Sequence, residues 1–251
     1  MWAHLAKPRR RLDLTLVELC LADSRTQAQA LIDDRNVLVN GAVATKYATK
    51  VSLSDQVNLT VPKPRYVSRA GLKLEHAIAA GWLDPTGLMC LDAGSSTGGF
   101  TDCLLQYGAE HVTAVDVGTN QLHEKLRSHP KVSLHEQTDI RKFDSPQRFD
   151  LVVADLSFIS ISSVIEYLVA LAKTGAKVVL LIKPQFEAGR QVVSKGGGVV
   201  SDPDVWLSVI RLRVFECLQL GLTFDAISAS PIKGVSGNVE FVVAFTKADV
   251  V

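Results

Sequence analysis

A glycine-rich segment near the middle of the chain has residue types and spacing that suit a nucleoside ligand. An apolar run ends in Asp92, the chain passes Gly94 and the Gly98-Gly99 pair, and a helix-like run begins at Phe100. Glycines let the backbone come close to a ligand, and a helix start offers free N–H groups. The spacing differs from the G-x-G-x-x-G of dinucleotide binders, and no Lys follows Gly99 as in phosphate loops. These features favour a cationic nucleoside without phosphates, such as S-adenosylmethionine (SAM); the alternative is a tight turn without a ligand.

Further charged residues stand where apolar, strand-like runs end. Asp116 and Asp155 each close such a run, Lys183 closes another, and Asp139 follows a third. Ligands on parallel α/β sheets lie beyond the carboxyl ends of the strands, so these positions favour a functional role. We expect Asp116 to accept hydrogen bonds from ribose hydroxyls and Asp139 to meet an adenine edge. For Lys183, the alternative is a purely structural ion pair.

The elements that must position these residues alternate between strand and helix. Short apolar runs separated by helical patterns predict an α/β fold with a parallel, doubly wound sheet. Lys73 lies on the first of the expected helices, where a Lys is usually only solvated. The expected strands are 111–116, 132–136, 149–155, 176–184, 223–228 and 239–245, and the expected helices are a capped helix at 68–78, then 161–172 and 204–220.

The beginning of the chain reads as a small α+β unit of its own. Leu12 leads into a helical pattern, and Ser24 is suited to the N-cap of a second helix. Asn40-Gly41 between two β-branched runs predicts a hairpin turn.

Proline content and charge separate this unit from the rest of the chain. Segment 62–67 holds two prolines that disfavour helix, so we expect a linker there between domains at 1–61 and 68–251. Residues 1–65 carry ten Lys and Arg against six acids, whereas the remainder carries 17 against 20. A basic head on a mildly acidic body indicates an anionic partner held by the head.

The composition also argues against several classes of protein. The four cysteines lie far apart with no C-x-x-C pair, so neither a zinc site nor a redox pair is indicated. A basic run, Lys7 to Arg11, interrupts any signal-like apolar core, and apolar runs such as Val178–Ile182 are far too short to span a bilayer. We therefore expect a soluble, cytoplasmic protein with reduced thiols and with neither a membrane nor a metal among its partners.

The head resembles the RNA-binding module named after ribosomal small-subunit protein four. The resemblance rests on Arg11-Leu12-Asp13, on Ser24 to Ala28 and on Val37 to Gly41. It implies that basic side chains contact RNA phosphates, which gives salt-dependent affinity rather than sequence choice. The alternative is a solvated basic face on a structural cap. The candidate RNA-binding residues are Arg9, Arg10, Arg11, Arg25, Arg35 and Arg69.

Three motifs in the body resemble the TlyA family of ribosomal RNA 2′-O-methyltransferases. They lie at residues 91–102, 155–160 and 181–187. That family carries an RNA module of this type before an FtsJ/RrmJ-like methyltransferase domain. The resemblance implies a Rossmann-like SAM-dependent methyltransferase sheet, SAM as cofactor, and ribosomal RNA or ribosomal subunits as partners, with cytidine as the target.

The resemblance also implies a catalytic tetrad of Lys73, Asp155, Lys183 and Glu240. A ribose hydroxyl must lose its proton as it attacks a sulfonium methyl, so two ammonium groups could stabilise the alkoxide while two carboxylates orient them. Whether Lys183 acts as a base or only as a stabiliser stays open at this point. The candidate cofactor-binding residues are Asp92, Gly94, Ser95, Ser96, Thr97, Gly98, Gly99, Phe100, Asp116, Asp139 and Asp155.

Two other functions fit parts of the sequence. An RNA-binding, ribosome-associated protein with a vestigial SAM site would keep the basic head, but it would not need the complete tetrad. A haemolysin or cytolysin, a name also given to members of this family, would need an amphipathic or apolar insertion segment, and we find none in the sequence. The sequence therefore predicts a SAM-dependent rRNA (cytidine-2′-O)-methyltransferase.

Overall fold

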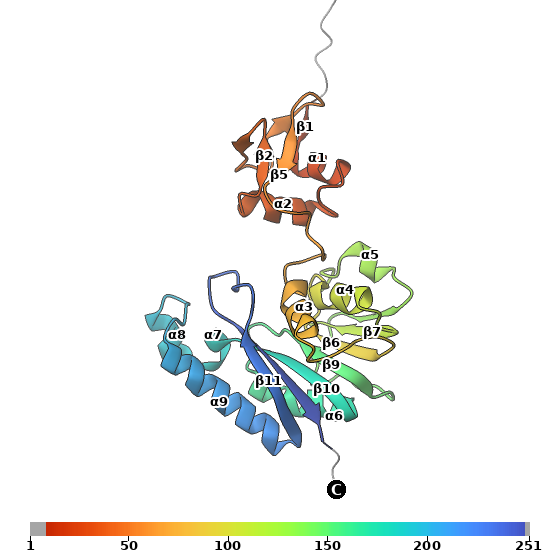
Figure 1. Cartoon of the computed structure of the whole chain (residues 1–251), viewed down its shortest axis with the longest axis vertical. Coiled ribbons are helices and arrows are strands. Elements are labelled where there is room, and N and C mark those ends of the chain that lie inside the picture. The colour runs from red at the N-terminus through yellow and green to blue at the C-terminus, as the bar shows by residue number, and fades with distance from the viewer. Residues whose placement is uncertain (1–8, 249–251) are drawn as a thin grey trace, which may run out of the picture. The chain divides into compact units, whose positions relative to one another are not determined.

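The computed structural model describes residues 9–248 and divides the chain into two compact units, with the boundary between Ser68 and Arg69 (Figure 1). The first unit holds two short helices and small strands, and the second is built on a single large sheet. Each unit has its own apolar interior, so each is described by itself.

The first unit packs its two helices against small antiparallel sheets. Ser24 caps the second helix by accepting a hydrogen bond from the Gln27 N–H, and Asn40-Gly41 makes the hairpin turn with positive φ at both residues. Both predictions are confirmed. The elements are β1 Arg10–Arg11, α1 Leu12–Glu18, α2 Arg25–Asp33, β2 Val37–Val39, β3 Ala42–Val43, β4 Lys50–Val51 and β5 Val57–Leu59, with β1 pairing β4 and the order β3-β2-β5 in the other sheet.

A buried carboxylate holds the start of the first unit together. The Asp13 side chain has no exposed surface, and its oxygens accept two hydrogen bonds from Arg11 at 2.9 Å, one from Arg25 at 2.8 Å and one from Gln29 at 3.0 Å. The hydrogen bonds from Arg11, and then those from Arg25 and Gln29, hold the pKa of Asp13 well below its ordinary value, although burial acts in the opposite direction. Two of the arginines expected to face RNA are therefore also fixed within the unit.

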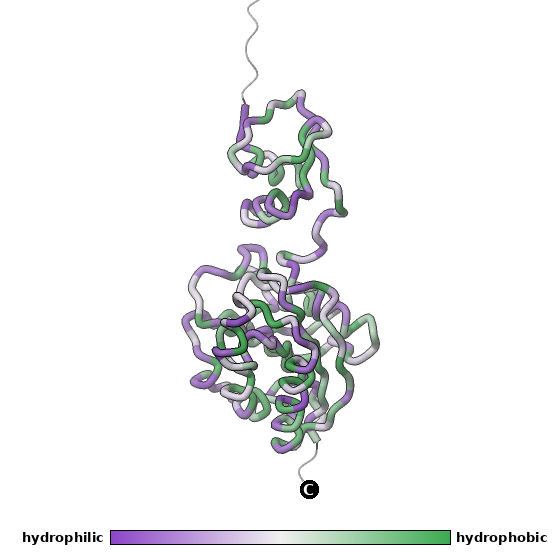
Figure 2. Tube along the Cα trace, turned by 90° about the vertical axis from the view of Figure 1, so that its left-hand side faces the viewer, coloured by the Kyte–Doolittle hydropathy of each residue, from purple (hydrophilic) through white to green (hydrophobic). Residues whose placement is uncertain are grey.

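The second unit contains a seven-stranded sheet in the order β11-β12-β10-β9-β6-β7-β8. Most residues of its central strands are apolar and buried, and hydrophobic segments of the trace run through this unit in Figure 2. The strands are β6 Met89–Ala93, β7 His111–Val115, β8 Val132–His135, β9 Phe149–Ala154, β10 Ala172–Ile182, β11 Leu222–Ala229 and β12 Phe241–Lys247. The helices are α3 Gly71–Ala79, α4 Gly99–Gln106, α5 Glu124–Arg127, the 3-10 turn η1 Ile161–Ser163, α6 Ile165–Leu171, α7 Pro184–Glu187, α8 Arg190–Lys195 and α9 Pro203–Gln219.

Helices cover both faces of this sheet. Alternate residues of β10, such as Val178 and Leu180, join one core cluster with Leu168 of α6 and Val209 of α9. Helices α3 and α4 pack together against the opposite face (Figure 1). A sheet covered on both faces explains why its central strands read as continuous apolar runs.

The expected parallel, doubly wound sheet is confirmed for most strands, and β12 is the exception. This strand pairs antiparallel with both neighbours, β10 and β11, whereas β6 to β10 are parallel to one another. The β11–β12 connection reverses the chain, as in a hairpin, and inserts β12 between β11 and β10. As a result, β12 begins at the edge of the sheet where the parallel strands end.

The first helix of the second unit also differs from expectation. It begins at Gly71 rather than at Ser68, and its N-cap residue, Ala70, offers no side chain to the free N–H groups. The expected helix over 161–172 is divided into the 3-10 turn η1 and α6, and the chain passes into β10 at Ala172. These differences are local and leave the order of elements unchanged.

We expect Asp13→Asn to lower the local stability of the first unit by about 1–3 kcal/mol at pH 7, because two arginines and Gln29 lose a buried, charged acceptor. A carboxylate whose pKa is depressed in the folded state stabilises it above the unfolded pKa of about 3.9, and this contribution is lost as the pH falls further. The difference between variant and wild type should therefore shrink below about pH 4. Hydrogen exchange of amides in α1 and α2 measures it.

The matched control is Glu18→Gln, because Glu18 is half exposed and pairs with exposed Arg10. It should change the exchange free energies by less than about 0.5 kcal/mol. Equal effects of the two variants would contradict the role given to Asp13.

Candidate active site

The glycine-rich loop joins β6 to α4 and passes close to the chain that follows β9. Gly94 has φ +82°, and a Cβ at this position would lie 2.9 Å from Leu156 Cδ2 and 3.1 Å from the Asp155 carbonyl oxygen. Gly98, with φ +98°, is the N-cap of α4, and a Cβ there would lie 2.4 Å from Leu126. These two positions require glycine because of both backbone conformation and space.

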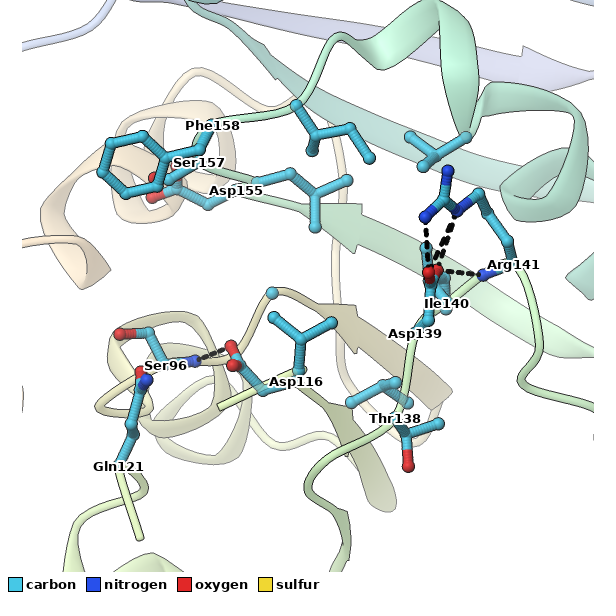
Figure 3. Close-up of a pocket in the computed structure, with 16 residues that line it drawn as sticks. Ser96, Asp116, Gln121, Thr138, Asp139, Ile140, Arg141, Asp155, Ser157 and Phe158 are labelled. Atoms are coloured by element: carbon cyan, nitrogen blue, oxygen red, sulfur yellow. Dashed lines mark hydrogen bonds and ion pairs between the residues drawn. The ribbon is translucent and has the colours of Figure 1, made fainter. Parts of the chain in front are cut away.

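A pocket of about 370 Å³ opens at the carboxyl ends of the parallel strands (Figure 3). It lies within the size range of small-ligand sites. Segments that follow β6, β7, β8 and β9 all contribute to its wall, as expected for a ligand site on this type of sheet. The wall residues are Gly94, Ser96, Val115, Asp116, Val117, Gln121, Thr138, Asp139, Ile140, Arg141, Asp155, Leu156, Ser157, Phe158, Ile159 and Val164.

Two carboxylates in the pocket wall are already oriented by the protein. Asp116 accepts hydrogen bonds from the backbone N–H of Ser96 at 2.8 Å (Figure 3) and from that of Gly118 at 2.7 Å. Asp139 accepts hydrogen bonds from the side chain and backbone of Arg141, which lower its pKa to about 2. Any ligand that approaches the Asp139 carboxylate must therefore share it with Arg141. The sequence did not indicate this pairing of Asp139 with Arg141.

Asp92 lies below the loop rather than in the pocket wall. It is completely buried, and its carboxylate accepts a hydrogen bond of 2.6 Å from the Thr101 hydroxyl, while the other oxygen has no hydrogen-bond partner among the described residues. Burial raises the pKa of Asp92 to about 7, against the effect of the Thr101 hydrogen bond. The other expected cofactor residues outside the wall are Ser95, Thr97, Gly98, Gly99 and Phe100.

The four residues of the expected tetrad meet beside this pocket. Lys73 Nζ lies 3.0 Å from Asp155 Oδ2 and 2.7 Å from Glu240 Oε2, and Lys183 Nζ lies 2.6 Å from Asp155 Oδ1. All four side chains are buried, with exposed fractions of 11% or less. Lys183 also donates a hydrogen bond of 3.0 Å to the Ser157 hydroxyl. The four side chains thus form a row of alternating charge in the order Glu240–Lys73–Asp155–Lys183.

The fold explains how these residues come together. Asp155 follows β9 and Lys183 follows β10, and these strands are parallel neighbours, so both residues stand at the same edge. Glu240 directly precedes β12, whose reversed direction brings its start to that edge. Lys73, on the first turn of α3, reaches Asp155 and Glu240 from the face of the sheet that α3 covers.

Asp155 and Lys73 stabilise each other's charged form. Burial favours a neutral Asp155, but the positive charges of Lys183 and Lys73 outweigh it and lower the pKa of Asp155 below its ordinary value. For Lys73, burial acts to lower the pKa, whereas Asp155 and Glu240 raise it, and the net pKa is above the ordinary value. A buried carboxylate between two ammonium groups satisfies the requirement that buried charges be paired.

Known families match both units. Residues 66–247 match the FtsJ-like methyltransferase family, and residues 10–57 match the S4 domain. This chain belongs to the FtsJ-like methyltransferase family.

Relatives over nearly the whole length narrow the family further. A 16S/23S rRNA (cytidine-2′-O)-methyltransferase TlyA from Mycobacterium tuberculosis is 44% identical over 93% of this chain and 88% of the relative. A 23S rRNA (cytidine-2′-O)-methyltransferase TlyA from Campylobacter jejuni is 37% identical over 89% of this chain and 94% of the relative. A solved structure of a proposed hemolysin from Streptococcus thermophilus is 36% identical, with a TM-score of 0.76 over 97% of this chain and 90% of that one. The chain is thus a TlyA-type member, and the haemolysin name is a second label within the same group.

Two aromatic side chains near the tetrad were missed by the sequence analysis. Phe158, in the turn after β9, is 91% exposed at the pocket mouth, with φ +65°, and its ring lies 5.3 Å from that of Phe186 in α7. The Phe186 ring in turn lies 5.8 Å from Lys183 Nζ. The exposure of Phe158 could not be read from the sequence, because apolar residues are expected to be buried.

Asn238 was also missed as a positioning residue. It is almost completely buried, accepts a hydrogen bond from the Val200 N–H at 2.9 Å and donates one to the Gly198 carbonyl at 3.0 Å. Because Asn238 lies two residues before Glu240, it ties the glycine-rich loop after α8 to the segment that carries the tetrad acid.

The arginines expected to bind RNA have different surroundings. In the S4 domain, Arg11 and Arg25 are held by Asp13, Arg10 pairs with Glu18, and Arg9 and Arg35 are exposed. Arg69 is exposed and belongs to the second unit. Among residues 9–248, no helix is long and apolar enough to cross a membrane.

Replacing Gly94 should test the close approach of the loop to Asp155. Gly94→Ala adds a Cβ in contact with Leu156 and the Asp155 carbonyl at an unfavourable φ, whereas Gly175→Ala, at φ +77°, adds one into open space. We expect Gly175→Ala to cost about 1–2 kcal/mol from backbone strain, and Gly94→Ala about 1–3 kcal/mol more from overpacking. Urea unfolding of the second unit, followed by Trp82 and Trp206 fluorescence, measures both, and equal losses would exclude the proposed contact.

Replacing Asp92 should change how stability depends on pH. A carboxyl group whose pKa rises from about 3.9 to about 7 on folding costs stability that is absent at low pH, grows as pH rises, and levels off above pH 7. Asp92→Asn removes this cost, so its stability relative to wild type should rise between pH 4 and 7 by at most about 1.4 kcal/mol per pH unit. Denaturant midpoints of both proteins, measured across this pH range, test the prediction. If the two midpoints change with pH in parallel, burial does not favour the protonated form of Asp92.

Proposed function

We propose that this protein transfers the methyl group of SAM to the ribose 2′-hydroxyl of a cytidine in ribosomal RNA. The observation that carries the proposal is the row Glu240–Lys73–Asp155–Lys183, buried and charged, at the edge of a pocket that Asp155 itself lines. The rRNA (cytidine-2′-O)-methyltransferases from M. tuberculosis and C. jejuni, similar along nearly the whole chain, support the substrate assignment.

The pocket wall fits SAM in charge and in shape. Asp116 gives it negative charge, which suits a sulfonium cation, while Asp155 is paired with Lys73 and Lys183 and Asp139 with Arg141. The Asp116 carboxylate, fixed by two backbone N–H groups, still has lone pairs that ribose hydroxyls can use. Apolar residues Val117 and Ile140 provide a surface for the adenine. We assign Asp116 to the ribose and Asp139 to the adenine side.

The remaining cofactor residues lie at the loop outside the pocket wall. Within residues 9–248, one Asp92 oxygen and the buried Ser95 hydroxyl have no hydrogen-bond partner, which leaves polar capacity for a bound water that supports the loop. Gly98 and Gly99 start α4, whose first N–H groups point toward the loop. We propose that these residues set the loop conformation and that Gly94 and Ser96 form its contact with SAM.

The chemistry follows from the charges of the tetrad. Bound SAM supplies an electrophilic methyl group. The 2′-hydroxyl would give its proton to water as its oxygen bonds the methyl group and S-adenosylhomocysteine leaves, and the ammonium groups of Lys183 and Lys73 would stabilise the negative charge of the oxygen as its proton departs. Asp155 holds both ammonium groups in place, and Glu240 holds Lys73 from the other side. We propose electrostatic stabilisation as the shared role of the two lysines.

The RNA side of the site is formed by other parts of the chain. The basic S4 domain gives sequence-independent contacts to rRNA phosphates, which position the substrate. The exposed ring of Phe158 beside Phe186 offers a surface on which an unstacked base can lie. Ribosomal subunits carry the accessible rRNA, so we place the reaction in the cytoplasm. No feature of residues 9–248 favours a cytolytic role.

Removing one ammonium group should abolish most activity without affecting SAM binding. Lys183→Ala should lower kcat for methyl transfer to ribosomal subunits by about 10²–10³-fold, the loss typical of one transition-state donor. SAM affinity, measured by calorimetry, should stay within about threefold, since Lys183 does not line the pocket. Radiolabelled methyl transfer and mass-spectrometric mapping of the rRNA supply the readouts.

The control is Lys173→Ala, at the other end of β10, where the lysine pairs with Asp150 at the surface. It should retain full activity. A wild-type protein that binds SAM yet modifies no subunit would instead favour the RNA-binding protein with a vestigial SAM site.

A further inference from the structure

Helix α7, which begins directly after Lys183, is fastened at its far end by a buried carboxylate. The Glu187 side chain is 2% exposed; its Oε2 accepts a hydrogen bond of 2.5 Å from the Ser160 hydroxyl, and its Oε1 accepts one of 2.8 Å from the Ile161 N–H. Both oxygens therefore bind the turn that follows Phe158.

A buried arginine from a third segment supports this contact. Arg213 of α9 is 8% exposed, its Nε lies 3.6 Å from Glu187 Oε2, and its Nη1 donates a hydrogen bond of 3.4 Å to the Ser160 hydroxyl. On its outer side Arg213 pairs with Glu216 at 2.8 Å. Arg213 thus stands between Glu187 and Glu216, and it ties α9 to both α7 and the turn after β9.

The two segments joined by Glu187 carry groups that face the reaction. Helix α7 follows Lys183 and contains Phe186, and the turn contains Ser157 and Phe158. Three contacts join these two segments. Lys183 donates a hydrogen bond to Ser157, and the ring of Phe186 lies beside that of Phe158. Glu187 accepts a hydrogen bond from Ser160.

We infer that Glu187, held by Arg213, is a positioning residue that fixes Lys183 and the exposed Phe158 relative to each other on the RNA side of the site. The inference rests on the proposed function, because it assigns the fastening to methyl transfer rather than to SAM binding. Neither Glu187 nor Arg213 lines the pocket. A small displacement of a catalytic group slows a reaction steeply, so a loosened α7 lowers kcat while SAM still binds.

The first experiment separates positioning from simple stability. Glu187→Ala should lower kcat for subunit methylation by about 10- to 100-fold and leave the SAM dissociation constant within twofold. Glu187→Gln, which keeps the volume and one acceptor oxygen, should recover part of the lost kcat. Glu166→Gln, on the exposed face of α6, is the matched control and should behave as wild type. A kcat within twofold of wild type for Glu187→Ala, or a loss of SAM affinity parallel to the loss of kcat, overturns the inference.

A second variant covers the case in which Glu187→Ala is poorly folded because Arg213 loses a buried partner. The double variant Glu187→Ala/Arg213→Met removes both charges and should restore the unfolding temperature toward wild type without restoring kcat. Recovery of kcat together with stability would show a purely structural pair and overturn the inference.

Hydrogen exchange tests the fastening itself, independently of activity. The Ile161 N–H donates to Glu187, so exchange in the peptide that covers residues 158–164 should accelerate at least tenfold in Glu187→Ala and not in Glu166→Gln. Unchanged exchange overturns the inference. If the wild-type protein methylates no rRNA, the proposed function fails, and the exchange result still decides whether Glu187 holds the turn.

Discussion

The carboxylate of Asp155 between two ammonium groups is the interaction on which the site depends. Each of its oxygens lies within 3.0 Å of a different lysine, in a region where all three side chains are almost completely buried. Isolated charges would not remain ionised there, and removal of one partner leaves the others uncompensated. The strand end, the helix and the loop that carry these residues must therefore arrive at one point together, which makes the tetrad a constraint on the fold as well as on the chemistry.

The sheet meets this constraint through one reversed strand. Parallel neighbours β9 and β10 place Asp155 and Lys183 at the same edge, but no later parallel strand could begin there. Because β12 runs antiparallel to β10, the residue before its first position, Glu240, lies at that edge and reaches Lys73. The strand order therefore brings Glu240, which precedes β12, to the edge where Asp155 and Lys183 follow the ends of β9 and β10.

Much of this arrangement could be predicted from the sequence, and the remainder could not for identifiable reasons. Asp116 and Lys183 follow apolar runs, so the rule for ligand sites on parallel sheets was enough to place them. Lys73 and Glu240 carry no such local signal and were found only by family resemblance. Side-chain pairing across distant segments is invisible to periodicity, and for that reason the Arg141 partner of Asp139 and the contact between Glu187 and Arg213 emerged only in three dimensions.

Asp155 also belongs to both parts of the site. It lines the pocket with Asp116, and its carboxylate holds Lys183 and Lys73, neither of which lines the pocket. In the proposed methyl transfer, the ribose oxygen needs positive neighbours as its proton leaves, and the two lysines supply them from outside the pocket proposed for SAM. Asp155 thus links the pocket to the two lysines, and a displacement of this one carboxylate would disturb both parts of the site.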